Sequence, residues 1–254
     1  MKTKTIKVHG KYKQMVYPIT DQDFKNQVHE IHNMEHYLSG LLHIKERYKD
    51  PNKKAVVMDL GANIGNTSLF YAPFVKQVHS FEPNPLIFEA LAKNTTKEKN
   101  IAIHNYGVSY KNTTFSMHSK EKNDPPQTLY LDKPEHSQAA EFKTIDTIFE
   151  ECKIDHVDVL KADIEGSEYV LFCSSGFAKV ADKIDTIIGE AHYMSQNSAS
   201  PDFIPLILAD YGFKTEFLDF KPPNYVRFLN YEDPVTKEKK TWKKQENTIF
   251  WAYK

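Results

Sequence analysis

Cysteine is scarce in this chain of 254 residues, whose two thiols are Cys152 and Cys173. Two cysteines cannot build a disulfide framework or a four-cysteine metal site, so we expect a reduced, cytoplasmic protein. The sequence also lacks an apolar run long enough to span a membrane. Its first seven residues are basic but lack the apolar region of a signal peptide.

An excess of charge of one sign is missing as well. The net charge of −1 creates no global field that would attract nucleic acid or an anionic membrane, so neither partner is expected. With 40% hydrophobic residues, the chain can bury one sizeable core. We expect an arm and helical cap over residues 1–52 and a single globular unit over residues 53–254. The sequence carries no signal for an oligomeric state.

Residues 55–66 combine a short apolar run, an acid and a glycine-punctuated turn, and a helix-like pattern follows. A strand, a tight turn and a helix start in this order form a nucleotide-type pocket, because free backbone N–H groups line the helix start. The turn contains Gly61 and Gly65, but Asn63 replaces the second glycine of a dinucleotide-binding loop. Asp59 at the strand tip would repel a pyrophosphate by about 4 kcal/mol at ~4 Å. The pattern favours a ligand with a cationic or amino-acid end, such as S-adenosylmethionine.

A second acid, Glu82, ends the apolar run at residues 78–82. An acid at the tip of the second strand can accept the hydroxyl hydrogens of a ribose. Taken singly, Asp59 could be a loop carboxylate and Glu82 a helix-start acid, but their spacing favours one shared ligand. A third strand over residues 101–106 leads into a turn at 106–109 that is placed to cover an adenine ring.

The alternation of strands and helices predicts an α/β fold with a parallel sheet and right-handed crossovers. Ligands of such sheets gather at the carboxyl ends of the strands. Further strands are expected at residues 157–162 and 185–192, and a final antiparallel pair at 213–220 and 247–253. The helical pattern that starts at Asp21 and runs to residue 50 could cap the pocket mouth or merely cover an edge of the sheet.

Two segments outside this alternation carry weaker signals. Residues 109–142 are polar and irregular, and we expect residues 113–117 to pair with residues 128–131 as a small hairpin. The basic run at 236–244 contains Trp242 and could contact an anionic substrate or nucleic acid. A solvated hairpin is the better interpretation of that run.

Acidic and basic residues cluster where the strand at 157–162 ends. Lys161, Asp163 and Glu165 alternate, so an extended chain points their side chains in one direction. Such clusters are typical of working sites, because neighbouring carboxylates shift one another's pKa. The alternative is a capping network, in which Ser167 or Asp163 caps the next helix and Glu168 occupies its first turn. Glu190 and His192 reach the same rim from the strand at 185–192.

These motifs resemble those of the FkbM-type methyltransferases. The resemblance rests on residues 59–65, 81–84 and 161–168 and covers roughly residues 55–192. It implies a Rossmann-like class I methyltransferase fold with a seven-stranded, mostly parallel sheet, helices on both faces and S-adenosylmethionine as cofactor. It implies O-methylation of a hydroxyl on a small molecule, sugar or glycan.

Carried over residue by residue, the resemblance predicts both halves of the site. Around the methionine part of the cofactor it puts Asp59, Gly61, Asn63 and Gly65, on the ribose Glu82, and near the sulfonium and acceptor Asp163. The predicted cofactor set also includes Ala62, Thr67, Pro83 and Val108.

The base that accepts the hydroxyl proton is open at this point. His192 is the first candidate and Asp163 or Glu165 the second, with Lys161 part of the same catalytic cluster. Alternatively, Asp163, Glu165 and Glu190 could hold a divalent cation that acidifies the hydroxyl.

Two other functions remain open. A nicotinamide-dependent oxidoreductase would use Glu82 in the same way, although Asn63 and Asp59 argue against a pyrophosphate. A non-catalytic S-adenosylmethionine-binding scaffold would keep Asp59 and Glu82 without needing the cluster at 163–168. A nucleic-acid methyltransferase is disfavoured, because the usual Asn/Asp-Pro-Pro-aromatic motif is missing at the fourth strand and Asp124-Pro125-Pro126 lies in a loop.

Overall fold

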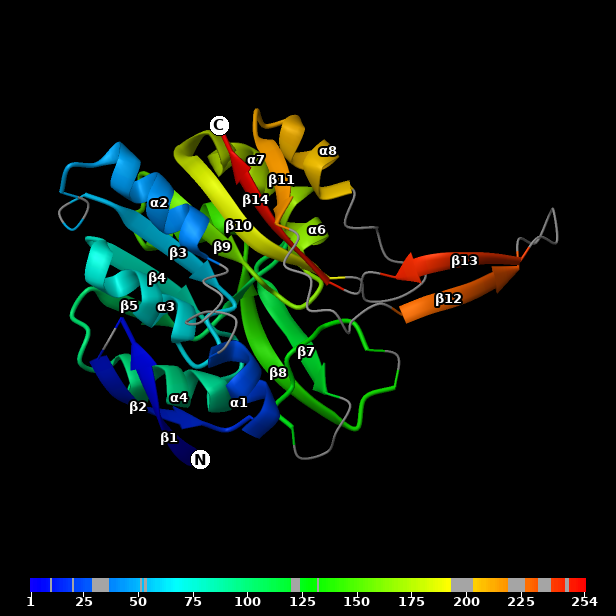
Figure 1. Ribbon diagram of the computed structural model, residues 1–254, viewed down its shortest axis with the longest axis horizontal. Coiled ribbons are helices and arrows are strands. Elements are labelled where there is room, and N and C mark those ends of the chain that lie inside the picture. The colour runs from blue at the N-terminus through cyan, green and yellow to red at the C-terminus, as the bar shows by residue number, and fades with distance from the viewer. Residues whose placement is uncertain are drawn as a thin grey trace.

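The computed structural model describes residues 1–9, 11–19, 21–28, 37–50, 52, 54–119, 124–131, 133–192, 203–218, 227–232, 239–244 and 247–254. Its centre is a seven-stranded sheet with the strand order β11-β14-β10-β9-β3-β4-β5 (Figure 1). These strands are β3 (Val56–Leu60), β4 (Gln77–Phe81), β5 (Ile101–His104), β9 (Val157–Ala162), β10 (Ile184–His192), β11 (Lys214–Leu218) and β14 (Asn247–Tyr253).

All neighbours in this sheet are parallel except β14, which runs antiparallel to both β10 and β11. The predicted antiparallel final pair is therefore confirmed. The chain builds outward from β3 to β5 and then returns to β9 on the other side of β3. This reversal of direction opens a crevice at the carboxyl ends of β3 and β9, where ligands of open α/β sheets bind.

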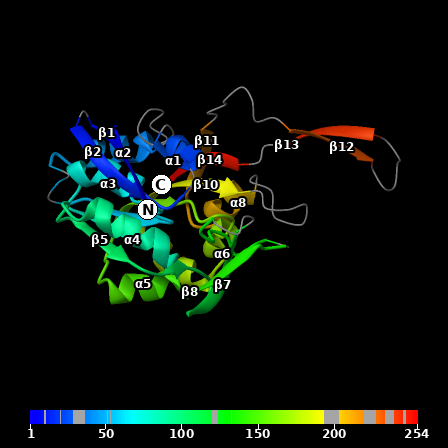
Figure 2. The same ribbon diagram turned by 90° about the horizontal axis from the view of Figure 1, so that it is seen from below.

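Helices cover both faces of the sheet, as expected (Figures 1 and 2). One face packs against α2 (Leu38–Arg47) and α3 (Asn66–Tyr71) through Val57, Val159 and Ile188. The other packs against α5 (Ile145–Glu151), α6 (Glu168–Phe172), α7 (Ser175–Val180) and α8 (Phe203–Ala209). Neighbouring residues such as Val57 and Met58 face opposite sides, because side chains alternate along a strand.

The N-terminal segment joins the body as a hairpin and two helices. The hairpin of β1 (Lys2–Val8) and β2 (Lys11–Tyr17) packs on α4 (Pro85–Thr95). The sequence predicted an N-terminal arm but not the helix against which it packs. The predicted helical pattern forms α1 (Asp21–Val28) and α2, and residues 29–36 lie outside the described part. α1 lies at the pocket described below, whereas α2 covers the interior strands β9 and β10 and not an edge of the sheet. The division of the chain at residue 52 stays a prediction.

The predicted hairpin over residues 113–131 is wrong. β7 (Thr113–Ser119) pairs instead with β8 (His136–Lys143), and β6 (Gly107–Val108) completes this three-stranded sheet. The segment 128–131 contributes a single bridge, from Thr128 to His118. Residues 136–143, and not the β-favouring residues 128–131, form the strand that pairs with β7. Ala140 and Phe142 pack against Met117, and strand pairing depends on such side-chain contacts.

Residues 239–244 of the basic run form one strand of a hairpin, as expected, and residues 236–238 lie outside the described part of the chain. β12 (Arg227–Glu232) and β13 (Lys239–Lys244) pair antiparallel and project from the body (Figure 1). Within the described residues, none of the helices is both long and apolar enough to cross a membrane.

The turn after β3 depends on Gly61, whose φ is +73°, and a matched pair of variants tests this. A Cβ at Gly61 would meet the carbonyl oxygen of Asp163, whereas a Cβ at Gly212 (φ +82°) would meet nothing within 4 Å. Gly212→Ala should cost about 1 kcal/mol of unfolding free energy from backbone strain alone. Gly61→Ala should cost about 3 kcal/mol or more, because overpacking adds to the strain. Urea unfolding measures both, and equal losses would contradict the close approach of the two loops.

Candidate active site

A cavity of about 420 Å³ lies at the carboxyl ends of β3, β4, β9 and β10. Most predicted site residues line it: Gly61, Ala62, Asn63, Thr67, Glu82, Pro83, Val108, Lys161, Asp163, Glu165, Glu190 and His192. Asp59 and Gly65 are not among the lining residues. The residues predicted from the sequence therefore come together around one cavity. Asp59 contacts the lining residue Lys161, and Gly65 is the N-cap of α3.

The glycine turn uses left-handed backbone at three positions. Gly61, Asn63 and Gly65 have φ values of +73°, +49° and +93°. Asparagine tolerates this conformation better than most residues, because its short side chain bonds locally. Here Asn63 Oδ1 accepts the backbone N–H of Ile64 at 2.8 Å. Asn63 thus takes the place of a glycine without breaking the turn, and Gly65 starts α3.

Asp59 is fully buried and does not line the cavity, and its contact with the cofactor stays a prediction. Its Oδ2 accepts the Ser68 hydroxyl at 2.5 Å, and its Oδ1 lies 3.3 Å from the Lys161 ammonium. Ser68 also bonds Ser80 on β4 at 2.7 Å. Asp59 therefore holds β3, α3 and β9 together, and it acts on the pocket through Lys161.

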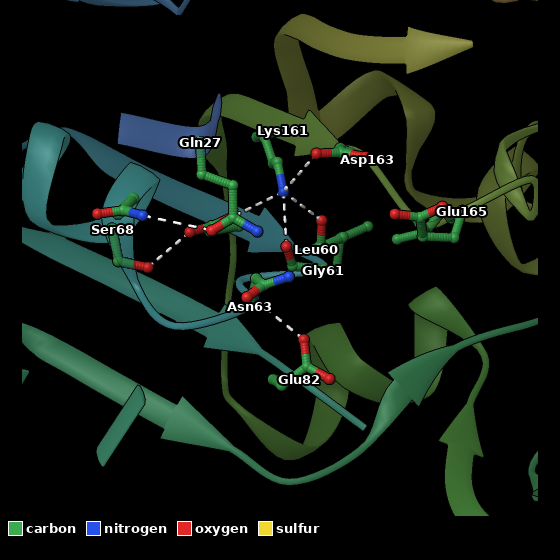
Figure 3. Close-up of polar contacts among 12 residues, drawn as sticks. Gln27, Leu60, Gly61, Asn63, Ser68, Glu82, Lys161, Asp163 and Glu165 are labelled. Atoms are coloured by element: carbon green, nitrogen blue, oxygen red, sulfur yellow. Dashed lines mark hydrogen bonds and ion pairs between the residues drawn. The ribbon is translucent and has the colours of Figure 1, made fainter. Parts of the chain in front are cut away.

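Lys161 binds the glycine turn to β9 (Figure 3). Its ammonium donates to the carbonyl oxygens of Leu60 and Gly61 at 3.1 and 2.7 Å, and it lies 3.5 Å from Asp163 Oδ2. Burial alone would lower the pKa of this 2%-exposed lysine, but Asp163 and Asp59 outweigh burial and raise it. The ammonium stays charged with its donors committed, which makes Lys161 a positioning residue.

Glu82 is buried with one face toward the pocket. Its two oxygens accept the backbone N–H groups of Asn63 and Asn84 at 3.0 and 2.9 Å. Burial nevertheless raises the pKa of Glu82 to about 7, and those two hydrogen bonds only partly oppose the shift. A carboxylate can accept more than these two hydrogen bonds, and the two hydroxyls of a ribose would supply further donors. The residues present therefore fit a nucleoside ligand.

His192 and Glu168 form a hydrogen-bonded pair at the opposite side. His192 Nδ1 lies 3.0 Å from Glu168 Oε1, while Glu168 also accepts the backbone N–H groups of Ile164 and Gly166. Because Glu168 can only accept, His192 donates from Nδ1 and its Nε2 lies toward Asp163 and Glu165, at 3.8 and 3.7 Å. Burial alone would lower the pKa of His192, but the surrounding carboxylates, Glu168 first, raise it well above its usual value.

The structure regroups the residues that were considered for a divalent cation. Asp163, Glu190 and His192 offer ligand atoms within 4.8 Å of one another, with His192 in the place expected of Glu165. The Lys161 ammonium lies beside Asp163, and His192 holds its proton more tightly than an ordinary histidine. These two cations offset part of the negative charge of the surrounding carboxylates.

Several lining residues were missed from the sequence. Asp23, Asn26 and Gln27 on α1 reach the pocket, and their spacing of three and four residues is a helical-face signal that was available. Gln127 reaches the pocket from the segment between β7 and β8, where its Oε1 accepts a hydrogen bond from Asn63 Nδ2 at 3.3 Å. Capping by Glu168 was the alternative to a working site, and Glu168 does accept two backbone N–H groups, while its pairing with His192 could be seen only in the fold.

With this geometry in place, the family is clear. Residues 59–215, more than half of the chain, match the methyltransferase FkbM domain. The chain belongs to this family of S-adenosylmethionine-dependent methyltransferases, and membership implies S-adenosylmethionine as the cofactor. The nicotinamide-dependent alternative loses its support.

Several solved structures are similar to this chain at low sequence identity. A methyltransferase FkbM from Methylobacillus flagellatus KT has 16% identity and a TM-score of 0.48, covering 78% of this chain and 43% of its own. A SAM-dependent methyltransferase from Agrobacterium tumefaciens has 8% identity and a TM-score of 0.49 (100% and 70% covered). A putative RNA methyltransferase from Pyrococcus horikoshii has 13% identity and a TM-score of 0.40 (85% and 80% covered). None of the curated proteins matches the chain in sequence.

Removing the Lys161 charge should destabilise the protein more than removing it together with its partner. Lys161→Met leaves Asp59 buried without its cation, a loss of about 3–5 kcal/mol. Adding Asp59→Asn should restore part of that loss, because no buried charge is then left unpaired. Urea unfolding measures both, with the exposed Lys93→Met as a control that changes stability by less than about 0.5 kcal/mol. An unchanged Lys161→Met midpoint would contradict this role.

Cofactor affinity should rise with pH through Glu82. Below a pKa of about 7 the free protein carries a proton on Glu82 that ribose hydroxyls would displace. Affinity for S-adenosylhomocysteine should therefore fall by up to about tenfold per pH unit from pH ~7 toward ~5.5. Glu82→Gln should bind more weakly and lose this slope. Calorimetric titration across this range measures both, and the same slope in the variant would assign the proton to another group.

Proposed function

We propose that this protein transfers the methyl group of S-adenosylmethionine to a hydroxyl oxygen of a small-molecule, sugar or glycan acceptor. The observation that carries the proposal is the Glu168–His192 pair, in which Glu168 holds Nδ1 and leaves Nε2 toward Asp163 in a residue that lines the pocket. Methylation of a hydroxyl requires a group that takes its proton, and an oriented imidazole is the commonest such group in proteins. A scaffold that only binds the cofactor would not need this pair.

The chain's own residues divide the work between two halves of the pocket. Glu82 and the turn at 61–63 would hold the ribose and the amino-acid end of the cofactor, with Val108 on the wall. When bound, the cofactor supplies a methyl group that its sulfonium already activates. His192 accepts the acceptor's proton at Nε2, Glu168 fixes the ring by its bond to Nδ1, and Asp163 stabilises the imidazolium.

The acceptor half of the pocket favours a polar ligand without negative charge. Asn26 and Gln27 on α1 present amide groups, while Glu165 and Glu190 add carboxylates on the opposite side. Amides and carboxylates together match hydroxyl and ammonium groups, whereas an anionic acceptor would be repelled. This supports a neutral or amino sugar rather than a phosphorylated acceptor or a nucleic acid.

The test of the reaction uses labelled S-adenosylmethionine with a panel of simple glycosides and amino sugars, and magnetic resonance to locate the new methyl group. An O-methyl product would establish the reaction. Cofactor binding without transfer to any panel member would favour the non-catalytic scaffold. Removal of divalent ions with a chelator should leave turnover unchanged, because His192 and not a metal ion takes the proton.

His192→Ala should lower kcat about 10²–10⁴-fold and leave the affinity for S-adenosylhomocysteine unchanged. Steady-state kinetics and calorimetry measure the two quantities. Unchanged turnover would remove His192 as the base and leave Asp163 or Glu165 as candidates.

Glu168→Gln gives a signature that a purely structural role would not produce. In the wild type, turnover should rise with pH, because Nε2 can accept a proton only above the raised pKa of His192. Without the Glu168 carboxylate that pKa falls, so the rising limb should move to lower pH while the plateau drops about 10–100-fold. Both follow from pH profiles of kcat, and a limb that stays in place would contradict the pairing.

A further inference from the structure

We propose that His79, His104 and Cys152 form a binding site for a zinc ion at the edge of the main sheet. His79 lies on β4 and His104 on β5, the outermost strand, while Cys152 follows the last residue of α5. None of the three lines the cavity described above. The site is therefore separate from the pocket and does not depend on the proposed function.

The fold brings three ligand atoms together from three different elements. On the parallel strands β4 and β5, His104 pairs with Phe81, two residues beyond His79, so both histidines face the same side of the sheet. This side is the one covered by α5, because Phe81 packs in the core cluster that contains Ile148 and Phe149. All three side chains are half-buried, which leaves the cluster accessible to an ion.

The separations are close to those of a tetrahedral zinc site. Donors at Zn–N distances of about 2.0–2.1 Å and Zn–S of about 2.3 Å lie about 3.3–3.6 Å apart. His79 Nδ1 lies 3.4 Å from His104 Nε2, and Cys152 Sγ lies 3.9 Å from the same nitrogen. All three ligand atoms lie within 4.8 Å of one another, so a rotation of the Cys152 side chain toward the two imidazoles would bring the three donors around one ion.

The donor chemistry fits zinc rather than magnesium or calcium. Two imidazoles and a thiol are borderline-to-soft ligands, whereas hard cations prefer oxygen. The nearby carboxylate of Glu151 is already paired, because its Oε2 lies 2.6 Å from the Lys143 ammonium.

The experiment uses the full chain, stripped with a chelator and titrated with Co²⁺ as a spectroscopic probe. Wild type should bind one equivalent at this cluster with the visible bands of tetrahedral cobalt and a near-ultraviolet thiolate-to-cobalt band, and Zn²⁺ should displace it. Cys152→Ser should lose the thiolate band and weaken binding about 100-fold or more. Cys173→Ser, which changes the exposed second thiol, is the matched control and should behave as wild type.

Two further variants separate this site from the pocket. His104→Gln should lose the tetrahedral spectrum, and His192→Ala should keep it. A thiolate band that survives Cys152→Ser, or an ion that is lost in His192→Ala, would place the metal elsewhere and overturn the proposal. Failure of Co²⁺ and Zn²⁺ to bind at micromolar concentration would overturn it as well. Circular dichroism and S-adenosylhomocysteine binding show that the variants are folded.

Discussion

The buried ammonium of Lys161 is the interaction on which the site depends. Taking a cation out of water costs several kcal/mol unless its partners are well placed, and here two backbone carbonyls and two carboxylates surround it. Because these oxygens come from β3, the glycine turn and the end of β9, one side chain fixes all three relative to each other. The pocket keeps its shape because Asp59 holds this ammonium from below.

The two ends of the pocket are electrostatic opposites. Glu82 is a carboxylate with too few donors, so burial raises its pKa to about 7. His192 is surrounded by carboxylates, so its pKa is raised despite burial. Each end suits a different part of a ligand. Ribose hydroxyls would donate hydrogen bonds to Glu82, and the neutral form of His192 would take a proton from the acceptor hydroxyl. Groups with pKa values displaced in this way mark acid–base roles better than conservation of charge would.

The sequence was sufficient for the central sheet, because its parallel strands are short segments rich in β-favouring residues, such as Val56 and Val57, that alternate with helical patterns. It was also sufficient for the rim residues that follow those strands. It failed where long-range contacts decide. The pairing of β7 with β8 depends on Ala140 and Phe142 meeting Met117, and the pairing of Glu168 with His192 joins residues 24 positions apart. Asp59 looked like a ligand residue because sequence shows its position at a strand tip but not its burial.

Phe81 connects the two sites discussed above. Phe81 is one of the residues that line the cavity, and its ring stacks on that of His104, with ring centroids 4.5 Å apart and an interplanar angle of 12°. An ion held by His104 would fix that imidazole and, through the stack, the orientation of the pocket wall formed by Phe81. Linkage is reciprocal, so a metal ion that favours one arrangement of this wall changes cofactor affinity by the same factor as the cofactor changes metal affinity. The sheet edge would then be a place from which the pocket is tuned without touching Glu82 or His192.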